Sequence, residues 1–472
     1  MTHRFPPASL VPSASALALL ASPAIAQEES AALNLDPVVV TATRTEVQRL
    51  EVPAAVSVVS SEKIEEQGAR SVAEALHGEP CVRVSYYTEG NFPIVQIRSS
   101  GDAGQFQNTD VLVLIDGIPQ VNLNDQSYYD QIPFDSIDRI EVARGPTSAL
   151  YGRNAVGGAI NIITKRAPSE REISATGTVG SFEYVKPRLS IGDNVNLLVS
   201  GSFERADGWR DQTEREAVDL FARADIFLTP EIDVTLTGRH FDLVQETPTI
   251  LPLLPDGSEV PDVDREDSFN LPGAESRNEA LQLAATLNYE PNDGLLFTVA
   301  IYYRQTDRIL DRDGSFIDNV DTTAQTFDLY PFTPTSEESI IGIAPRVTWT
   351  PTERVELVVG VDYEQNDGES GASNIFPAGT NFFTPITVNY ATGQFLNDID
   401  NLETLVRRDG DFESMILAAY AQGRVDVTDK LTLTLGGRYD TSMATQRSGP
   451  QSSRQRMRWP SPSAARAQPA TV

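Results

Sequence analysis

The chain has 472 residues, among which 67 acidic residues outnumber 37 basic ones, so that its formal net charge is -30. This excess of carboxylates excludes nucleic acid as a partner, because phosphate binding requires clustered lysine and arginine. The length accommodates two or three soluble domains, or one small domain followed by a membrane barrel.

Residues 1–26 are predicted to form a secretory signal peptide. A weakly basic start (His3 and Arg4) precedes a short apolar core at residues 14–21, and Ala24-Ile25-Ala26 has the small-x-small pattern of a cleavage site. The core is too short to cross a bilayer as a helix, and no later run reaches about 18 apolar residues. We therefore expect export without residence in the inner membrane.

Cys81 is the single cysteine of the chain, so an intramolecular disulfide is excluded. In an exported protein we expect it to be a small buried residue, and a reactive thiol is the alternative.

Residues 27–45 begin with polar residues and then become rich in β-branched ones around Val38-Val39-Val40-Thr41. Pro37 lacks a backbone donor, which suits the start of a strand or a sheet edge. Such a run near a mature N-terminus is either an edge strand or a segment that awaits a partner strand.

Residues 46–167 predict a compact α/β domain. Apolar runs predict strands at 56–59, 111–115 and 137–143, and Asp116-Gly117 predicts a tight turn after the second of them. Ser61 is expected to cap a short helix at 62–67, and a capping box formed by Ser71 and Glu74 opens a second helix that ends at Leu76.

From about residue 171 the pattern changes to alternation of apolar and polar residues, which is typical of strands. Clear examples occupy residues 195–203, 232–239, 281–289, 355–363 and 431–438.

The connections distinguish a membrane barrel from a soluble sheet protein. Short turns are expected at 229–231, 291–294, 350–353 and 428–430, and they alternate with long polar segments at 242–279, 308–338 and 365–411. All short turns then lie at one end of the barrel and all long loops at the other, which is the topology of bacterial outer-membrane barrels. Tyr289, Trp349, Tyr363 and Tyr439 near strand ends suit interfacial aromatic residues.

Four segments together resemble the TonB-dependent outer-membrane receptor family. They are Asp36-Pro37-Val38-Val39-Val40-Thr41-Ala42-Thr43-Arg44, which is similar to the TonB box; residues 68–76; residues 111–119; and Ile137 to Lys165, which includes Arg144-Gly145-Pro146 and Tyr151-Gly152. The family usually has Ile-Arg-Gly in the plug, where this chain has Ile97-Arg98-Ser99-Ser100-Gly101, and Cys81 replaces a common glycine.

The resemblance implies an α/β plug domain followed by a transmembrane antiparallel β-barrel in the bacterial outer membrane. It also implies the domain boundaries: signal peptide 1–26, TonB box and linker 27–45, plug 46–167 and partial barrel 168–447. The implied TonB-binding residues are Asp36, Pro37, Val38, Val39, Val40, Thr41, Ala42 and Thr43. The implied plug-motif residues are Arg98, Asp116, Gly117, Arg144, Gly145, Pro146, Tyr151, Gly152, Gly157, Gly158 and Asn161.

The glycines of the closing plug segment (Gly145, Gly152, Gly157 and Gly158) are expected to permit positive φ and close backbone approach. Gly152 and Gly157 have the spacing of the outer glycines of a P-loop, but Ala159 follows Gly158 where Lys-Ser/Thr is needed, so nucleotide binding is rejected.

The resemblance also implies function: active import of a scarce nutrient driven by the TonB energy-transducing protein, with a ferric siderophore as the favoured substrate. A cobalamin or carbohydrate importer of the same family is the alternative, and a passive porin-like channel is the alternative from another class. The expected partners are TonB, outer-membrane lipid and a small-molecule nutrient, and the expected state is a monomer.

An enzyme is not expected, since only His77 and His240 remain after signal removal and no zinc cluster or Ser-His-Asp arrangement is visible. No cofactor is expected. Acidic loop residues could hold Ca²⁺ but lack EF-hand spacing, so solvated loop charge is the favoured interpretation and no metal site is predicted. These residues are Asp262, Asp264, Glu266, Asp267, Asp311 and Asp313. Loop aromatics that could stack on a ligand are Phe332, Phe376, Phe382, Phe383 and Tyr390.

Family barrels have twenty-two strands, whereas this sequence predicts ten or eleven, the last near 430–439. Residues 448–472 contain no Asp or Glu and four arginines, and no strand is expected there. A frameshift or premature stop is the favoured interpretation, and a disordered tail is the alternative. An open half barrel exposes strand edges to lipid, so we expect the chain alone neither to insert stably nor to transport.

Overall fold

The computed structural model describes the chain from residue 39 to residue 456 with gaps. The described ranges are 39–40, 47–48, 55–88, 91–98, 100, 109–122, 126–127, 129, 132, 134–145, 147–193, 196–249, 251–254, 256–261, 263–311, 316–381, 383–428, 431–446 and 451–456. The predicted signal peptide, Asp36–Val38, Thr41–Thr43 and Pro146 lie outside these residues. No helix among the described residues is long and apolar enough to cross a membrane.

The plug is built on a five-stranded sheet in the order β3-β8-β9-β6-β7, in which only β6 and β9 run parallel. These strands are β3 (Ala55–Ser60), β8 (Ile137–Arg144), β9 (Gly158–Thr164), β6 (Val111–Ile115) and β7 (Ile118–Pro119). Every residue of β6 and β9 is buried, as expected for strands covered on both faces.

Three short helices and two hairpins complete the plug. The helices are α1 (Ser61–Gln67), α2 (Val72–Ala75) and α3 (Ser148–Tyr151); the hairpins pair β1 (Val39–Val40) with β2 (Val47–Gln48), and β4 (Val82–Thr88) with β5 (Asn91–Ile97). The main core includes Val59, Leu76, Val95, Val113, Ile140 and Ile160.

The helix caps differ slightly from the prediction. The N-cap of α1 is Ser60 rather than Ser61, because Ser60 ends strand β3 and its side chain accepts the N–H of Lys63. At α2, Ser71 caps the N–H of Glu74 as predicted, while the Glu74 carboxylate accepts the N–H of Arg70, one residue before the cap.

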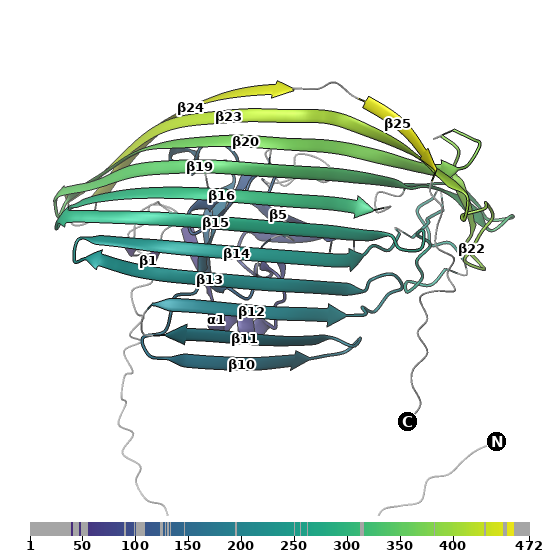
Figure 1. Ribbon diagram of the computed structural model, residues 1–472, viewed down its shortest axis with the longest axis horizontal. Coiled ribbons are helices and arrows are strands. Elements are labelled where there is room, and N and C mark those ends of the chain that lie inside the picture. The colour runs from purple at the N-terminus through teal and green to yellow at the C-terminus, as the bar shows by residue number, and fades with distance from the viewer. Residues whose placement is uncertain are drawn as a thin grey trace, which may run out of the picture. The chain divides into compact units, whose positions relative to one another are not determined.

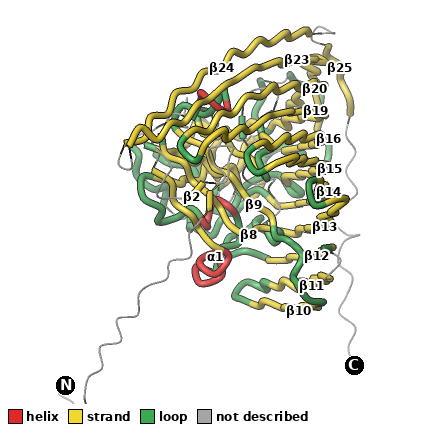
Figure 2. Tube along the Cα trace, turned by 90° about the vertical axis from the view of Figure 1, so that its left-hand side faces the viewer, coloured by secondary structure: helices red, strands yellow, loops and turns green. Residues whose placement is uncertain are grey.

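The second part is a large antiparallel sheet that curves around the plug (Figures 1 and 2). Its strands follow each other in chain order: β10 (Glu172–Val179), β11 (Val185–Asp193), β12 (Leu197–Ala206), β13 (Arg215–Thr229), β14 (Ile232–Glu246), β15 (Glu275–Asn292), β16 (Leu295–Asp311), β19 (Phe332–Thr352), β20 (Val355–Pro377), β23 (Leu402–Thr428) and β24 (Leu431–Gln446). Within the described residues β10 and β24 do not pair, so the sheet is an open part of a barrel. The predicted fold class is confirmed.

The apolar side chains of the sheet face away from the plug. On β12, Leu197, Val199 and Phe203 are 43%, 47% and 42% exposed, whereas Ser202 and Glu204 are buried. The same inversion occurs on β15, where Leu283 is half exposed and Gln282 is buried. A soluble barrel would have the opposite arrangement, so the outer surface is suited to lipid.

The predicted short turns join β13 to β14, β15 to β16, β19 to β20 and β23 to β24. The long polar segments contain more strand than expected, since their ends extend the barrel strands. Their middle parts form a small sheet of β17 (Phe316–Asp321), β18 (Thr326–Tyr330), β21 (Ile386–Asn389) and β22 (Gln394–Phe395). This loop layer has its own core, which includes Phe269, Phe327, Leu329, Ile386 and Val388.

Two expectations are wrong. Cys81 is exposed and has a φ of 61°, because it occupies a turn before β4 rather than the core. Residues 451–456, where no strand was expected, form β25 (Gln451–Arg456), which pairs with β23 beyond the end of β24. β25 pairs with residues 403–408 of β23, which lie beyond the residues that pair with β24, and strand pairing needs only backbone hydrogen bonds.

The outward position of Leu283 yields a stability prediction. Leu283→Arg should lower the free energy of unfolding in detergent micelles by about 2–4 kcal/mol, because a charge near the middle of an apolar outer face must be desolvated. The measurement is urea unfolding followed by tryptophan fluorescence. Thr286→Arg, on the inward parity of the same strand, is the matched control and should cost less. Equal costs would contradict the assigned orientation of the sheet.

Candidate functional site: the plug and its contacts with the barrel wall

The Asp116-Gly117 turn is anchored to the neighbouring strand β9. Asp116 and Gly117 have φ values of 50° and 80°, as a tight hairpin turn between β6 and β7 requires. The Asp116 carboxylate accepts the N–H and the hydroxyl of Thr164 at 2.9 and 2.8 Å, and the side chain of Asn161 accepts the N–H of Gly117 at 3.1 Å. Three predicted motif residues, Asp116, Gly117 and Asn161, therefore form one hydrogen-bonded unit with Thr164.

Gly145 and Gly152 bracket α3, and both have positive φ, 116° and 79°. Gly145 donates its N–H to the carbonyl of Gly157 at 3.0 Å. Gly152 lies against the barrel wall, where an added Cβ would stand 2.5 Å from Nε of Arg438 on β24. A side chain at Gly152 would displace Arg438 from its carboxylate partner Asp362.

Gly157 and Gly158 lie where neighbouring parts of the plug come too close to leave room for a side chain. An added Cβ on Gly157 would lie 2.5 Å from the Cβ of Ser100, and one on Gly158 would lie 2.4 Å from the carbonyl oxygen of Ala143 on β8. The N–H of Gly157 also donates to the carbonyl of Asp110 at 2.8 Å. The closing segment is thus packed backbone to backbone against β8 and the residues before β6.

The two motif arginines lie apart from this unit. Arg144 donates to the carbonyls of Ala55 and Pro80 at 3.3 and 2.8 Å, which ties the end of β8 to the β3 edge. Arg98 is exposed and has a φ of 51°, and its N–H donates to the carbonyl of Cys81 at 3.0 Å. Tyr151 is buried in a cluster that joins plug residues to Val358 and Tyr420 of the barrel.

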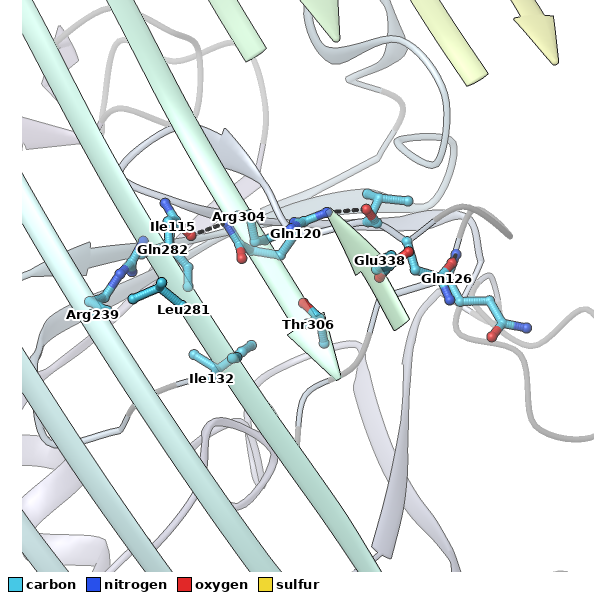
Figure 3. A pocket seen from close by; sticks show the side chains of 13 residues that line it. Ile115, Gln120, Gln126, Ile132, Arg239, Leu281, Gln282, Arg304, Thr306 and Glu338 are labelled. Carbon is cyan, nitrogen blue, oxygen red and sulfur yellow. Dashed lines mark hydrogen bonds between the residues drawn. The ribbon is translucent and has the colours of Figure 1, made fainter. Parts of the chain in front are cut away.

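Arg304 of β16 binds the plug backbone from the barrel side. Its guanidinium donates to the carbonyls of Pro119, at 2.7 Å, and of Val121. Next to it, the Gln120 side chain donates to Gln282 of β15 at 3.1 Å. Figure 3 shows these side chains around a small cavity between the plug and the wall, together with Arg239.

A second set of contacts converges on Asp135, in the plug loop before β8. Its carboxylate pairs with Lys186 at 3.0 Å and Arg188 at 3.3 Å, both on β11, and accepts the hydroxyl of Ser202 on β12. Its backbone N–H donates to Asp219 of β13 at 3.1 Å. Burial alone would raise the pKa of Asp135, but Lys186 and these hydrogen bonds more than offset it, so the pKa lies below its ordinary value. We call this group the Asp135 latch.

Two larger spaces separate the plug from the wall. The upper cavity, about 760 Å³, lies toward the long-loop ends of β10–β14, and its wall includes Tyr86, Phe134, Tyr184, Trp209 and Phe241. The lower cavity, about 530 Å³, lies toward the short turns and is lined by polar residues that include Asn161, Arg223, Thr235, Asn288 and Arg346. The small cavity at Gln120 lies between the same plug and the same wall.

Two of the loop aromatics that the sequence offered as ligand contacts are buried. Phe376 and Tyr390 are 1% and 3% exposed and belong to or adjoin the core of the loop layer, so they hold the loops together. Phe383 is 72% exposed, and Phe382 lies outside the described residues. Among the described residues, no group of three or more acidic, histidine or cysteine side chains could hold a metal ion.

Four contact residues were not predicted from the sequence: Asp135, Lys186, Glu204 and Arg304. Each is a charged residue that lies either at an inward-facing position of a strand or in a plug loop. The alternating pattern predicts that inward-facing residues are polar, but it does not predict which residues they contact. The one available signal was the number of charged residues at inward-facing positions of the strands.

The predicted TonB box is described only at Val39 and Val40. These residues pair with Gln48 and Val47 in a two-stranded sheet that is separate from the five-stranded plug sheet.

An α/β plug inside a curved antiparallel sheet whose apolar side chains face outward defines a plugged outer-membrane barrel. The TonB-dependent Receptor Plug Domain family matches residues 48–159, and the TonB dependent receptor-like β-barrel family matches residues 247–468. The chain belongs to the TonB-dependent receptor family, whose members are transporters of the bacterial outer membrane rather than enzymes.

Among its relatives, the vitamin B12 transporter BtuB of Photobacterium profundum is 32% identical over 289 residues, which are 60% of this chain and 44% of the relative. BtuB of Vibrio vulnificus is 30% identical over 45% of this chain and 36% of its own length. The solved siderophore receptor PiuA from Acinetobacter baumannii has the same fold, with a TM-score of 0.73 and 18% identity over 90% of this chain and 63% of PiuA. The chain thus spans less than half the length of the two BtuB proteins.

The Asp135 latch yields a pH prediction. Because its pKa is lower in the folded protein than in the unfolded chain, its stabilisation is complete above the ordinary value of 3.8 and is lost as the pH falls through the folded-state pKa. Asp135→Asn should therefore lower the free energy of unfolding of the plug at pH 7 by about 1.5–3 kcal/mol, since hydrogen bonds to a charged group are lost. The wild-type plug should lose stability as the pH falls below 4, and the Asp135→Asn plug should lose less.

The readout is protease digestion of the plug across a urea series at pH 7 and pH 3. Asp138→Asn, which removes a more exposed plug carboxylate that pairs with Arg139, is the control and should have a small effect. If digestion of the Asp135→Asn plug depends on urea and pH as in the wild type, the Asp135 latch does not stabilise the plug.

Proposed function

We propose that a receptor built from this plug and barrel wall acts in TonB-dependent active import of a scarce, bulky nutrient across the outer membrane, with the TonB energy-transducing protein as its partner; transport by this chain alone is not expected. The observation that carries this proposal is the plug itself. It occupies the inner side of the barrel wall and is joined to it largely by hydrogen bonds and ion pairs, with cavities toward both ends.

Import against a gradient requires work from the inner membrane, because the outer membrane has no ATP. An extended segment near the N-terminus can receive that work by β-strand addition, in which backbone hydrogen bonds supply the affinity. The strand pairing of Val39 and Val40 with Gln48 and Val47 supports this role, because it shows that the described part of the segment has the extended backbone that strand addition requires. Asp36 to Thr43 are the proposed TonB-binding residues.

The plug also argues against the passive porin. A porin needs an open lumen, whereas the plug of this chain contacts the wall at Arg304, Gln282 and the Asp135 latch. Movement or remodelling of the plug is therefore part of the proposed transport step.

The substrate is proposed from two sources. The curated relatives with 30% and 32% identity are vitamin B12 transporters, which supports a corrinoid as the first candidate. A ferric siderophore, the favoured substrate on sequence grounds, stays a prediction, since the siderophore receptor compared above resembles this chain at the level of fold. A carbohydrate has no observation in its favour.

Deletion of residues 36–43 tests the energy-coupling proposal. The 472-residue chain, refolded in detergent micelles, should bind the periplasmic domain of TonB in calorimetry, and the deletion should reduce this affinity at least tenfold because the pairing strand is gone. Binding of cyanocobalamin should change less than twofold.

Deletion of residues 28–35, which removes the same number of residues and leaves the box intact, is the control and should retain TonB binding. TonB binding that survives loss of residues 36–43 would refute the proposed coupling segment.

A further inference from the structure

We propose that the upper cavity is a binding site for a neutral, bulky solute with apolar or aromatic surface, and that Glu204 excludes anionic ferric chelates from it. This inference rests on the proposed function, which it extends to the charge class of the substrate. It concerns the wall formed by the plug and strands β10–β14.

The cavity offers rings for packing. Tyr86, Phe182 and Trp209 are 36%, 56% and 47% exposed along its wall, and Tyr184 stacks beneath the guanidinium of Arg70 at 5.8 Å. Burial raises the pKa of Tyr86 to about 12, so this phenol is neutral at physiological pH. A space of about 760 Å³ with several accessible rings suits a large, partly apolar ligand.

The cations of the wall are already paired with carboxylates. Three cations and four carboxylates line the cavity: Arg70, Lys186 and Arg215, with Glu74, Asp135, Glu204 and Asp219. Arg70 pairs with Glu74 at 3.3 Å, and Lys186 pairs with Asp135 at 3.0 Å. An anion that entered would lose its hydration and meet cations that carboxylates have neutralised.

Glu204 is the centre of this neutralisation. Its side chain is 6% exposed and holds two cations at once, Lys186 at 3.3 Å and Arg215 at 2.9 Å. Gln245 accepts a further hydrogen bond from Arg215 at 3.0 Å and fixes the guanidinium in place. Without the charge of Glu204, Arg215 would face the cavity with no carboxylate partner among these contacts.

The test uses Trp209 as a reporter in the full chain refolded in detergent micelles. Trp349→Phe and Trp459→Phe remove the other two tryptophans, so that quenching reports on the cavity wall. Cyanocobalamin serves as the neutral probe and ferric citrate as the anionic probe, with free tryptophan as the correction for absorbed light.

We expect cyanocobalamin to bind saturably and at least tenfold more tightly than ferric citrate. Glu204→Gln should raise the affinity for ferric citrate at least fivefold and change that for cyanocobalamin less than twofold. Glu216→Gln is the matched control: Glu216 lies on β13 with an exposed side chain outside the cavity wall, near Arg205, and its loss should leave both affinities unchanged.

Ferric citrate that binds the parent chain as tightly as cyanocobalamin would overturn the inference, and so would equal effects of Glu204→Gln and Glu216→Gln. If neither probe quenches Trp209 in a chain with intact β-sheet circular dichroism, the cavity is not the binding site. Failure of the proposed function would appear elsewhere, as TonB binding that does not depend on residues 36–43.

Discussion

The structure depends on one constraint: apolar side chains of the sheet must face lipid, so its inner wall is polar. On β12, Leu197 and Val199 point outward, and the alternate positions place Ser202 and Glu204 against the plug. A polar wall cannot hold the plug by hydrophobic burial alone. It holds it by directed contacts, of which Arg304 and the Asp135 latch are the clearest. Contacts of this kind exchange with water at modest net cost, whereas separation of an apolar interface would expose it to water.

The same constraint shapes the spaces around the plug. Inward-facing charges must be paired to remain buried, and Glu204 satisfies this requirement for both Lys186 and Arg215. The pairing leaves an upper cavity whose wall includes exposed aromatic rings and whose cations are neutralised. Structure and selectivity are therefore linked, because the carboxylate that stabilises the wall also determines which solutes the cavity admits.

Much of this fold could be predicted from the sequence, because its signals are local. The alternation of apolar and polar residues predicted the barrel strands and their outward faces. The short turns predicted the topology of the sheet, and Asp116-Gly117 predicted the hairpin in the plug. The long loops were harder, since the pairing of Phe327 with Val388 joins segments that are distant in sequence. Cys81 was misjudged because composition favours burial of cysteine, while the local turn holds it at the surface. Pairings across the plug and the wall, such as that of Asp135 with Lys186, have no sequence signal.

The most direct test of the outward-facing apolar surface uses two single-tryptophan chains in micelles of a detergent with brominated acyl chains. Trp349 lies on the outward parity of β19 and is 49% exposed, whereas Trp209 lines the upper cavity. The account predicts that brominated acyl chains quench Trp349 strongly and Trp209 weakly. Strong quenching of Trp209 with little effect on Trp349 would contradict the orientation of the sheet, and with it the polar attachment of the plug.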